Sequence, residues 1–320
     1  MENLDLKDKK ILYHLDLNSR ESYTKIGKKV GLYKEIVNYR IKRLQDKGII
    51  VRFNTIIDTL KLGYTIMRFY INYQYITPEI KKEIIDHFVN FKHTQIVASP
   101  EGGVDLCVFM IAKNVSEIHS FWQKTLCKYG DYFAKQIIAP FIGEKIYTKS
   151  FLIDGKDDRT NLIVRRGGEI IVYDDLDFQI LQLLAQNSRI PTIDIAKKLN
   201  ITTTTIMKRI KRLIEVGVIL RFHVTINWKK IGYKWFKVDL YLKDYNKTNQ
   251  IQKYLETNPN LAYIDKTFGY ADLELELIVK NVDQLKQIIE DLLGKFPKMI
   301  RNYSYFSVAN SHKWIDMPEK

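Results

Sequence analysis

The chain has 320 residues, of which 46% are hydrophobic and 28% are charged, and its formal net charge is +14. This composition is typical of a folded globular protein with several compact units and excludes a disordered chain. Its two cysteines, Cys107 and Cys127, are too few for a disulfide framework or a cysteine-based zinc site. No apolar run approaches the roughly 18 residues that cross a bilayer, and residues 1–10 lack the apolar core of a signal peptide. We therefore expect a cytoplasmic protein that has no membrane partner and favours a polyanion.

The first 60 residues predict three helices followed by a strand. Residues 4–18 and 23–30 form the first two helices, and Gly31 permits the sharp turn after them. The third helix carries an apolar stripe at positions i, i+4 and i+7, formed by Val37, Ile41 and Leu44. Gly48 ends this helix, and residues 49–53 read as a strand. This order is that of a winged helix-turn-helix domain.

Residues 64–141 predict six elements in the order β-α-β-β-α-β. The strands are rich in aromatic and β-branched residues and lie at residues 64–75, 94–99, 104–112 and 135–141. The helices begin at Pro78 and Val115. This is the split βαβ arrangement, in which helices cover one face of an antiparallel sheet.

The whole pattern occurs twice. Adding 169 maps residues 40–44 onto residues 209–213, which share the sequence Arg-Ile-Lys-Arg-Leu. The register runs without a gap through the helical region, and the offset later falls to 167, so that Gly102 maps onto Gly269. A tandem duplication explains both offsets.

We therefore expect an α+β protein with two winged helix-turn-helix domains that alternate with two ferredoxin-like domains. The first pair comprises residues 1–60 and 61–150, and the second pair comprises residues 173–230 and 231–320. Residues 151–172 form the linker, in which residues 169–173 predict a short strand.

The third helix of each helix-turn-helix unit predicts a DNA-binding surface. Its apolar stripe faces a small core, so that the opposite, partly basic face can enter a major groove of double-stranded DNA. The expected DNA-binding residues of the first copy are Lys34, Glu35, Asn38, Tyr39, Lys42 and Arg43. Those of the second copy are Thr202, Thr203, Thr204, Met207, Lys208, Lys211 and Arg212.

Within this set, basic residues suit phosphate contacts and uncharged residues suit base contacts. The phosphate candidates are Lys42, Arg43, Lys211 and Arg212. Arg40 and Arg209 border the apolar stripes, so that they fit either a structural ion pair or a phosphate contact. Asn38 is suited to adenine, and Thr203 or Thr204 to a thymine methyl group.

The duplicated pattern resembles the Lrp/AsnC family of feast/famine transcription regulators, written twice in one chain. The resemblance is carried by Asp8, Ile11-Leu12, Ile26, Lys29–Leu32, Val37, Arg40-Ile41, Arg43-Leu44, Gly48–Ile50, Gly102 and Asp105-Leu106, with their partners 169 or 167 positions later. It implies that each ferredoxin-like domain is a RAM or ACT-like domain, and that one chain mimics a family dimer whose two sheets pack together. Further self-association through these domains and contact with the transcription machinery are also implied.

The resemblance further implies an amino-acid effector near the turn between the second and third strands of each sheet. The candidate effector residues are Ser99, Gly102, Gly103, Asp105, Thr267, Gly269 and Asp272. The glycines equally suit tight turns, and the two aspartates suit either a ligand amine or a cap for the loop.

The two copies depart from the family and from each other. Family members usually place Ser or Thr as the N-cap of the recognition helix, but Tyr33 stands there in the first copy and Thr202 in the second. Because Tyr33 cannot cap, the first helix loses about 1 kcal/mol of end stabilisation. Tyr33 is instead suited to stacking on, or hydrogen bonding to, a phosphate. Two unlike recognition helices predict an imperfect palindrome with half-sites about one helical turn apart.

The alternative is an enzyme, because siroheme decarboxylases resemble this family in fold. Their signature is a His-Asn pair on the second strand and a Tyr-Asn-Leu-Trp-like run on the third. Residues 94–97, 104–107, 262–265 and 271–274 do not carry it. The six histidines are scattered without ligand spacing. We therefore expect no catalysis, no metal and no cofactor.

Overall fold

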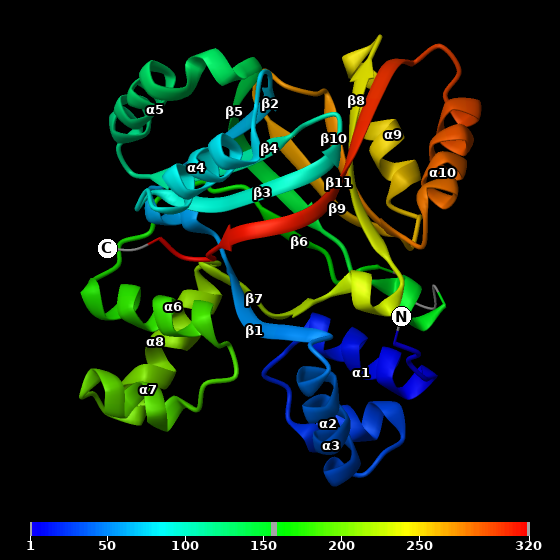
Figure 1. Ribbon diagram of the computed structural model, residues 1–320. Helices are drawn as coiled ribbons and strands as arrows, with labels where there is room; N and C mark the ends of the chain where they lie inside the picture. Colours follow the sequence, from blue (N-terminus) through cyan, green and yellow to red (C-terminus); the bar gives the residue numbers. More distant parts are fainter. Residues whose placement is uncertain (1, 155–158, 319–320) are drawn as a thin grey trace.

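Figure 1 shows the computed structural model, which describes residues 2–154 and 159–318. Two helical units lie side by side at one end of the molecule, and the longer strands with four flanking helices lie at the other. We call residues 6–57 the first head and residues 175–226 the second head.

Each head consists of three helices and a strand, as the sequence predicts. The first head contains α1 (Leu6–Leu17), α2 (Tyr23–Val30), α3 (Lys34–Asp46) and β1 (Ile50–Ile57). The second contains α6 (Asp175–Gln186), α7 (Thr192–Leu199), α8 (Thr203–Glu215) and β7 (Ile219–Ile226). Side chains cap the N-termini of two of these helices. Ser22 caps α2, and Asp174 with Asp177 forms a capping box on α6. Gly31 ends α2 in the left-handed conformation, with φ at 67°.

The rest of the chain repeats the order β-α-β-β-α-β twice, which confirms the predicted α+β class. The first copy contains β2 (Thr65–Tyr73), α4 (Pro78–Val89), β3 (Thr94–Gly102), β4 (Leu106–Ala112), α5 (Val115–Tyr129) and β5 (Phe133–Ile146). The second contains β8 (Lys234–Leu242), α9 (Thr248–Leu255), β9 (Leu261–Thr267), β10 (Leu273–Val279), α10 (Val282–Lys295) and β11 (Ile300–Trp314). Short 3₁₀ helices lie at Thr59–Leu62, Gly130–Tyr132, Ser150–Ile153, Trp228–Ile231 and Tyr245–Lys247.

The strands of both copies join into one antiparallel sheet rather than the two packed sheets that we expected. The strand order is β2-β4-β3-β11-β8-β10-β9-β5, and β5 pairs back onto β2, which closes a ring. Two strands of 14 and 15 residues, β5 and β11, make this closure possible. The first part of β5 pairs with β2 and its end pairs with β9, whereas β11 pairs with β8 and then with β3. We call these eight strands the barrel.

The two faces of the barrel strands differ in chemistry. On β10, Leu273, Leu275 and Leu277 pack against the flanking helices in one apolar cluster. Glu274, which alternates with these leucines, is fully buried from solvent and forms an ion pair with Lys237 of β8. Because successive side chains point to opposite faces of a strand, the polar face of this strand lines the barrel interior.

A two-stranded ribbon of β1 and β7 joins the heads. The strands pair antiparallel with Asn54 opposite His223, and these two positions are equivalent in the duplication. The buried hydroxyl groups of another equivalent pair, Ser19 and Ser188, lie 2.5 Å apart. The two heads are therefore related by a pseudo-twofold axis that passes through the ribbon.

The linker differs from its prediction. Residues 169–173 form no strand, and the Ile171 N–H donates instead to the carbonyl of Lys61, which lies in a 3₁₀ helix. The linker strand is β6 (Ile163–Arg165), which pairs with the end of β5. An added Cβ at Gly143 of β5 would collide with the carbonyl of Arg165. The absence of a side chain at Gly143 therefore allows the backbone of the linker to approach β5.

The N-caps of the two recognition helices generate a test. Tyr33 makes no side-chain cap hydrogen bond and is 83% exposed, whereas the Thr202 hydroxyl accepts from the Thr205 N–H. We expect Tyr33→Ser to stabilise the first turn of α3 by about 1 kcal/mol, and Thr202→Ala to cost α8 a similar amount. Amide hydrogen exchange at these turns measures both effects. Tyr33→Ala is the control, and equal protection in Tyr33→Ser and Tyr33→Ala would contradict the assignment.

Candidate nucleic-acid interface

The recognition helices α3 and α8 bury one face and expose the other. Val37, Ile41 and Leu44 are buried in the first head, and their equivalents are buried in the second. The predicted contact residues that are exposed on α3 are Lys34, Glu35, Asn38, Tyr39 and Lys42. Those at the start and outer face of α8 are Thr202, Thr204, Met207, Lys208 and Lys211, while Thr203 is half-buried. Both helices can therefore present a continuous outer face to a ligand.

Two arginines hold each recognition helix against the first helix of its head. In the first head, Arg40 and Arg43 reach the buried carboxylate of Asp8 at 2.8 and 2.6 Å. Arg40 also lies 2.6 Å from Asp5, and this hydrogen bond raises the pKa of Arg40. Of its two alternatives, a structural ion pair or a phosphate contact, Arg40 therefore forms the ion pair. Arg43 is also a structural residue of the head, so that its predicted phosphate contact stays a prediction.

The second head repeats this clamp at equivalent positions. Arg209 lies 2.7 Å from Asp174 and 3.0 Å from the buried Asp177, and Arg212 forms an ion pair with Asp177. The N–H of Asp177, together with Arg209, lowers the pKa of Asp174. Arg209 thus follows the structural alternative, and phosphate contact by Arg212 stays a prediction. Sequence reasoning missed both acceptors, Asp8 and Asp177, although their 169-residue spacing repeats that of the arginines.

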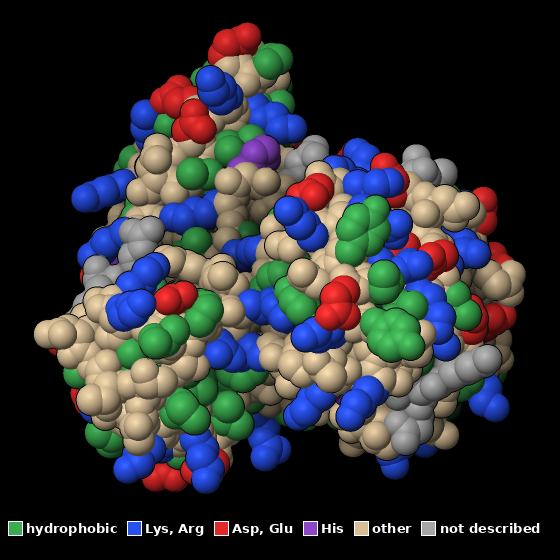
Figure 2. Space-filling view, turned by 90° about the horizontal axis from the view of Figure 1, so that it is seen from below, with side chains coloured by type: hydrophobic (Ala, Val, Ile, Leu, Met, Phe, Trp, Pro, Cys, Tyr) green, Lys and Arg blue, Asp and Glu red, His purple; other side chains and the backbone are tan. Residues whose placement is uncertain are grey.

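The basic residues that remain free for phosphates are the exposed lysines. Lys42 makes no ion pair within the described residues, and the contact of Lys211 with Glu215 at 3.7 Å is highly exposed and therefore weak. Figure 2 views the molecule from the side of the heads, where Lys and Arg side chains outnumber Asp and Glu and several line the boundary between two lobes. This face is suited to the phosphates of a nucleic acid.

Known DNA-binding proteins resemble these heads in sequence. A family described as winged helix-turn-helix DNA-binding matches residues 4–51 and 173–219, once in each head. An uncharacterized HTH-type transcriptional regulator of Pyrococcus furiosus is 30% identical over 121 residues, which are 38% of this chain and 82% of that protein. The regulator FL11 of the same organism is 28% identical over 47% of this chain and 98% of its own. LrpB of Bacillus subtilis is 27% identical over 38% of this chain and 80% of its own.

The chain belongs to the Lrp/AsnC family of HTH-type transcriptional regulators. Because each relative spans less than half of the chain, the match agrees with a duplicated regulator. Among solved structures, the crystal structure of the siroheme decarboxylase NirDL covers 98% of this chain and 94% of its own, with a TM-score of 0.64 and 13% sequence identity. At this identity the likeness shows a shared duplicated fold and nothing about chemistry.

In this Lrp/AsnC regulator, several candidate effector residues belong to the barrel strands or cap the loops between them. Ser99 and Gly102 lie in β3 and pair with β11, so that the first candidate loop is partly strand. Asp105 accepts from the N–H of Tyr73, and Asp272 accepts from the N–H of Leu242, which is the loop-capping alternative.

The two candidate loops meet at one end of the barrel. Val104 and Tyr270, one from each loop, share an apolar cluster. Gly103 lies beside the carbonyl of Tyr305 without a clash, Gly269 has a positive φ of 77°, and Thr267 pairs with Phe141. Effector binding at these residues stays a prediction.

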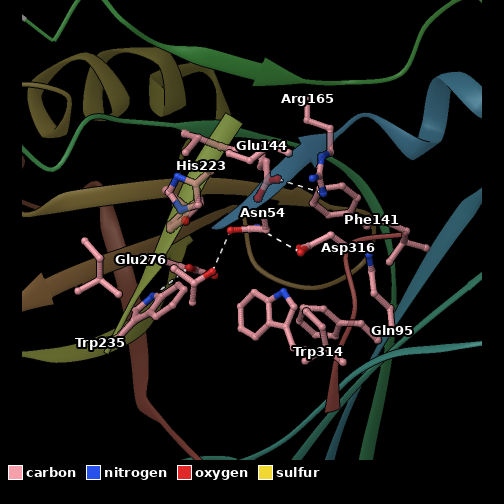
Figure 3. A pocket seen from close by; sticks show the side chains of 18 of the residues that line it. Asn54, Gln95, Phe141, Glu144, Arg165, His223, Trp235, Glu276, Trp314 and Asp316 are labelled. Atoms are coloured by element: carbon pink, nitrogen blue, oxygen red, sulfur yellow. Dashed lines mark hydrogen bonds and ion pairs between the residues drawn. The ribbon is translucent and has the colours of Figure 1, made fainter. Parts of the chain in front are cut away.

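The heads of this regulator cover a cavity that the sequence did not indicate. It has a volume of about 160 Å³ and lies between the ribbon and the barrel. Figure 3 shows Asn54 and His223 of the ribbon, Glu144 of β5, Glu276 of β10 and Trp314 of β11 around it. Groups from all eleven strands of the described residues, β1 to β11, converge here, and nothing local in the sequence marks them as neighbours. Within the described residues, no group of His, Cys, Asp and Glu side chains is arranged to hold a metal ion.

The arginine clamp generates a second test. We expect Asp8→Asn to lower the stability of the first head by about 2 kcal/mol, because two charge-assisted hydrogen bonds lose their acceptor charge. Urea denaturation followed by hydrogen exchange at α3 measures the loss. Asp46→Asn is the matched control, since Asp46 is exposed at the end of α3 in the same head and makes no ion pair within the described residues. Equal stabilities of the two variants would show that the clamp contributes little.

Proposed function

We propose that this chain regulates transcription by sequence-specific binding to double-stranded DNA, as a single-chain pseudo-dimer. The observation that supports this best is the ribbon, which holds two recognition helices in a pseudo-twofold relation within one chain. DNA with two half-sites in inverted orientation matches that relation. No helix within residues 2–154 and 159–318 is long and apolar enough to span a membrane.

The contact residues follow from exposure in the heads. We propose that Lys42 and Lys211 contact phosphates, while Asn38, Tyr39, Thr204, Met207 and Lys208 face the bases. Arg43 and Arg212 hold the recognition helices through ion pairs with Asp8 and Asp177. Only the exposed part of each guanidinium group can reach a phosphate. Lys34, Glu35, Thr202 and Thr203 lie at the start of their helices, where the helix N-terminus favours a phosphate.

The proposal extends to the organisation of the chain. Its functional units are the four predicted domains, residues 1–60, 61–150, 173–230 and 231–320, with residues 151–172 as the linker. We propose an amino-acid effector, self-association through the ferredoxin-like domains, contact with the transcription machinery and a cytoplasmic location.

We propose no catalysis, although the fold is shared with NirDL. The signature expected of a siroheme decarboxylase is absent from the sequence. The cavity of about 160 Å³ is close to the roughly 150 Å³ that accommodates one benzene ring in an engineered protein. A tetrapyrrole contains four pyrrole rings in one macrocycle and is too large for this cavity. Mixing the protein with siroheme should therefore leave the absorption spectrum of the tetrapyrrole unchanged.

The phosphate contacts predict a specific salt dependence. Each phosphate contact contributes about 0.9 to the slope of log affinity against log salt concentration, so that Lys42→Ala with Lys211→Ala should reduce that slope by about 2. Binding to all duplexes should weaken together. Fluorescence anisotropy at several salt concentrations measures both quantities.

The matched control removes the same charge elsewhere. Lys82 of α4 and Lys286 of α10 are exposed on the barrel helices, away from the heads. Lys82→Ala with Lys286→Ala should leave the slope unchanged. If both double variants reduce the slope equally, the outer faces of α3 and α8 are not the contact surface.

The unlike helices predict an asymmetric target. In vitro selection from random duplexes should return an imperfect palindrome. A variant with Lys34→Thr, Glu35→Thr, Asn38→Met and Tyr39→Lys gives α3 the outer residues of α8, so that its selected site should become a perfect palindrome. A perfect palindrome selected by the unmodified chain would contradict the assigned outer faces.

A further inference from the structure

The cavity between the ribbon and the barrel is a built site for a molecule of about one ring. Its roof is the ribbon at Asn54 and His223, the point at which the pseudo-twofold axis crosses. Its walls come from both copies of the barrel, including Arg68 of β2 and Glu276 of β10. Figure 3 shows Asn54, His223 and Glu276 converging from separate strands on a common space. With about 160 Å³, the space holds a benzene-sized body together with one polar group.

The cationic side chains that line the cavity already have carboxylate partners. Arg68 lies 2.6 Å from Asp265, and Arg165 lies 3.2 Å from Glu144. Lys149 lies 3.9 Å from the buried Asp16. These pairs leave no lining cation uncompensated, so that the cavity offers little to an anionic ligand.

Glu276 is the lining acid without such a partner. Within the described residues no Lys or Arg nitrogen lies within 4.0 Å of its carboxyl group, whose Oε2 accepts from the indole N–H of Trp235 at 2.9 Å. The same carboxyl group shares a hydrogen bond with Asp265. Burial, followed by the charge of Asp265, raises the pKa of Glu276. Because two carboxylates cannot share a hydrogen bond without a proton, this contact holds a proton where a cation would otherwise lie.

The charges around the cavity show the same imbalance. The cations of the lining and of its ion-pair network are Arg52, Arg68, Lys149, Arg165 and Lys237. The carboxyl groups are Asp16, Glu144, Asp239, Asp265, Glu274, Glu276 and Asp316. Among the described residues of this ion-pair network, acids therefore exceed cations in a buried environment, where an unpaired charge is costly. Arg159 and Arg221, which are outside this network, add positive charge near Lys149.

Two further observations point to a ligand rather than to a purely structural network. The amide of Gln95 is 8% exposed, lines the cavity and has no side-chain hydrogen bond within the described residues. The rings of Trp235, Tyr263 and Trp314 lie together on the wall, with Trp235 stacked 5.6 Å from Tyr263 and centred 6.1 Å from Trp314. The Lys149 ammonium lies over the Tyr263 ring at 4.6 Å, which leaves the rings of Trp235 and Trp314 for a ligand. Faces of such rings attract organic cations.

We propose that this cavity binds a small organic cation, with a protonated amine on the carboxylate of Glu276 and a ring-sized apolar body against Trp235 and Trp314. The ligand cation takes the place of the proton that Glu276 otherwise holds.

The position of the cavity gives the ligand a regulatory role, which rests on the proposed function. Asn54 of the ribbon donates to Asp316 at 3.2 Å, and Arg52 lies 3.0 Å from the same carboxylate. A molecule that touches both ribbon and barrel favours the arrangement of the heads that best fits it. Such differential contact is what a ligand needs to shift an equilibrium.

Benzylamine, benzyl alcohol and benzoate are the probes, because they share one ring and differ in charge. Three of the four tryptophans line the cavity and the fourth, Trp122, lies outside in the apolar cluster beneath α5, so that Trp122→Phe leaves a fluorescence signal from the site alone. With calorimetry and this signal, we expect benzylamine to bind at least tenfold more tightly than the alcohol or benzoate. Binding of benzoate in preference to benzylamine, or of none of the three, would overturn the proposal.

Glu276→Gln is the decisive variant, because Gln keeps an oxygen for the Trp235 N–H but loses the charge. Its benzylamine affinity should fall at least tenfold, while Glu290→Gln, on the exposed face of α10, should bind normally. An unchanged melting temperature shows that each variant is folded. Equal affinities of the two folded variants would remove Glu276 from the site.

The pH dependence has a definite sign. Glu276 must lose its proton to bind an ammonium group, so that benzylamine affinity should rise with pH through the raised pKa of Glu276, until the amine itself deprotonates. The titratable groups that face Glu276 are Arg68, Cys107, Glu144, Lys149, Lys237, Tyr263 and Asp265. Glu276→Gln should flatten the rise, and a profile that is identical in the variant would contradict the assignment.

The proposed ligand site and the proposed DNA-binding function can be refuted independently. Benzylamine binding is measured on the free chain, and its effect on DNA affinity is measured on the complex. Saturating benzylamine should change DNA affinity at least threefold in the unmodified chain and not in Glu276→Gln. Amine binding without DNA binding would refute the proposed function alone. DNA binding without amine binding would refute this inference alone.

Discussion

The antiparallel pairing of β1 with β7 is the constraint on which the arrangement of this molecule depends. Each strand ends a small helical head and would otherwise present an unpaired edge. Pairing them satisfies both edges and aligns Asn54 with its equivalent, His223, on the pseudo-twofold axis. Ser19 and Ser188 meet on the same axis. The relative placement of the two recognition helices is therefore a property of one chain and does not require a second subunit.

The sequence predicted the local elements well, because their signals are local. The apolar stripe of Val37, Ile41 and Leu44 and the stop at Gly48 determine α3 without reference to the rest of the chain. The closed barrel could not be predicted in this way, because β5 and β11 pair with strands of the other copy. The alternation of Leu and Glu in β10 indicated two unlike faces, but it did not show that Glu274 and Glu276 face another polar surface instead of solvent.

Duplication within one chain permits an asymmetry that a homodimer cannot have. The interior acids Asp239, Asp265, Glu274 and Glu276 belong to the second copy, and the equivalent residues of the first copy are Tyr70, Ala98, Cys107 and Phe109. In a homodimer each acid would occur twice around the axis, and eight buried carboxyl groups would repel one another. Separate copies also allow one exposed position of the recognition helix to hold Asn38 in the first copy and Met207 in the second. Fusion thus made both the interior and the outer faces of α3 and α8 free to diverge.

A buried network with more acids than cations is difficult to explain by stability alone, because removing charges from water costs more than such pairs commonly return. Its location offers a reason. The network extends from the barrel interior to the underside of the ribbon, where Asn54 and Arg52 reach Asp316. A cation that enters there relieves the excess acidity and contacts the element that positions both heads. The same charges that destabilise the empty interior therefore provide the free energy that links an occupied cavity to the arrangement of the recognition helices.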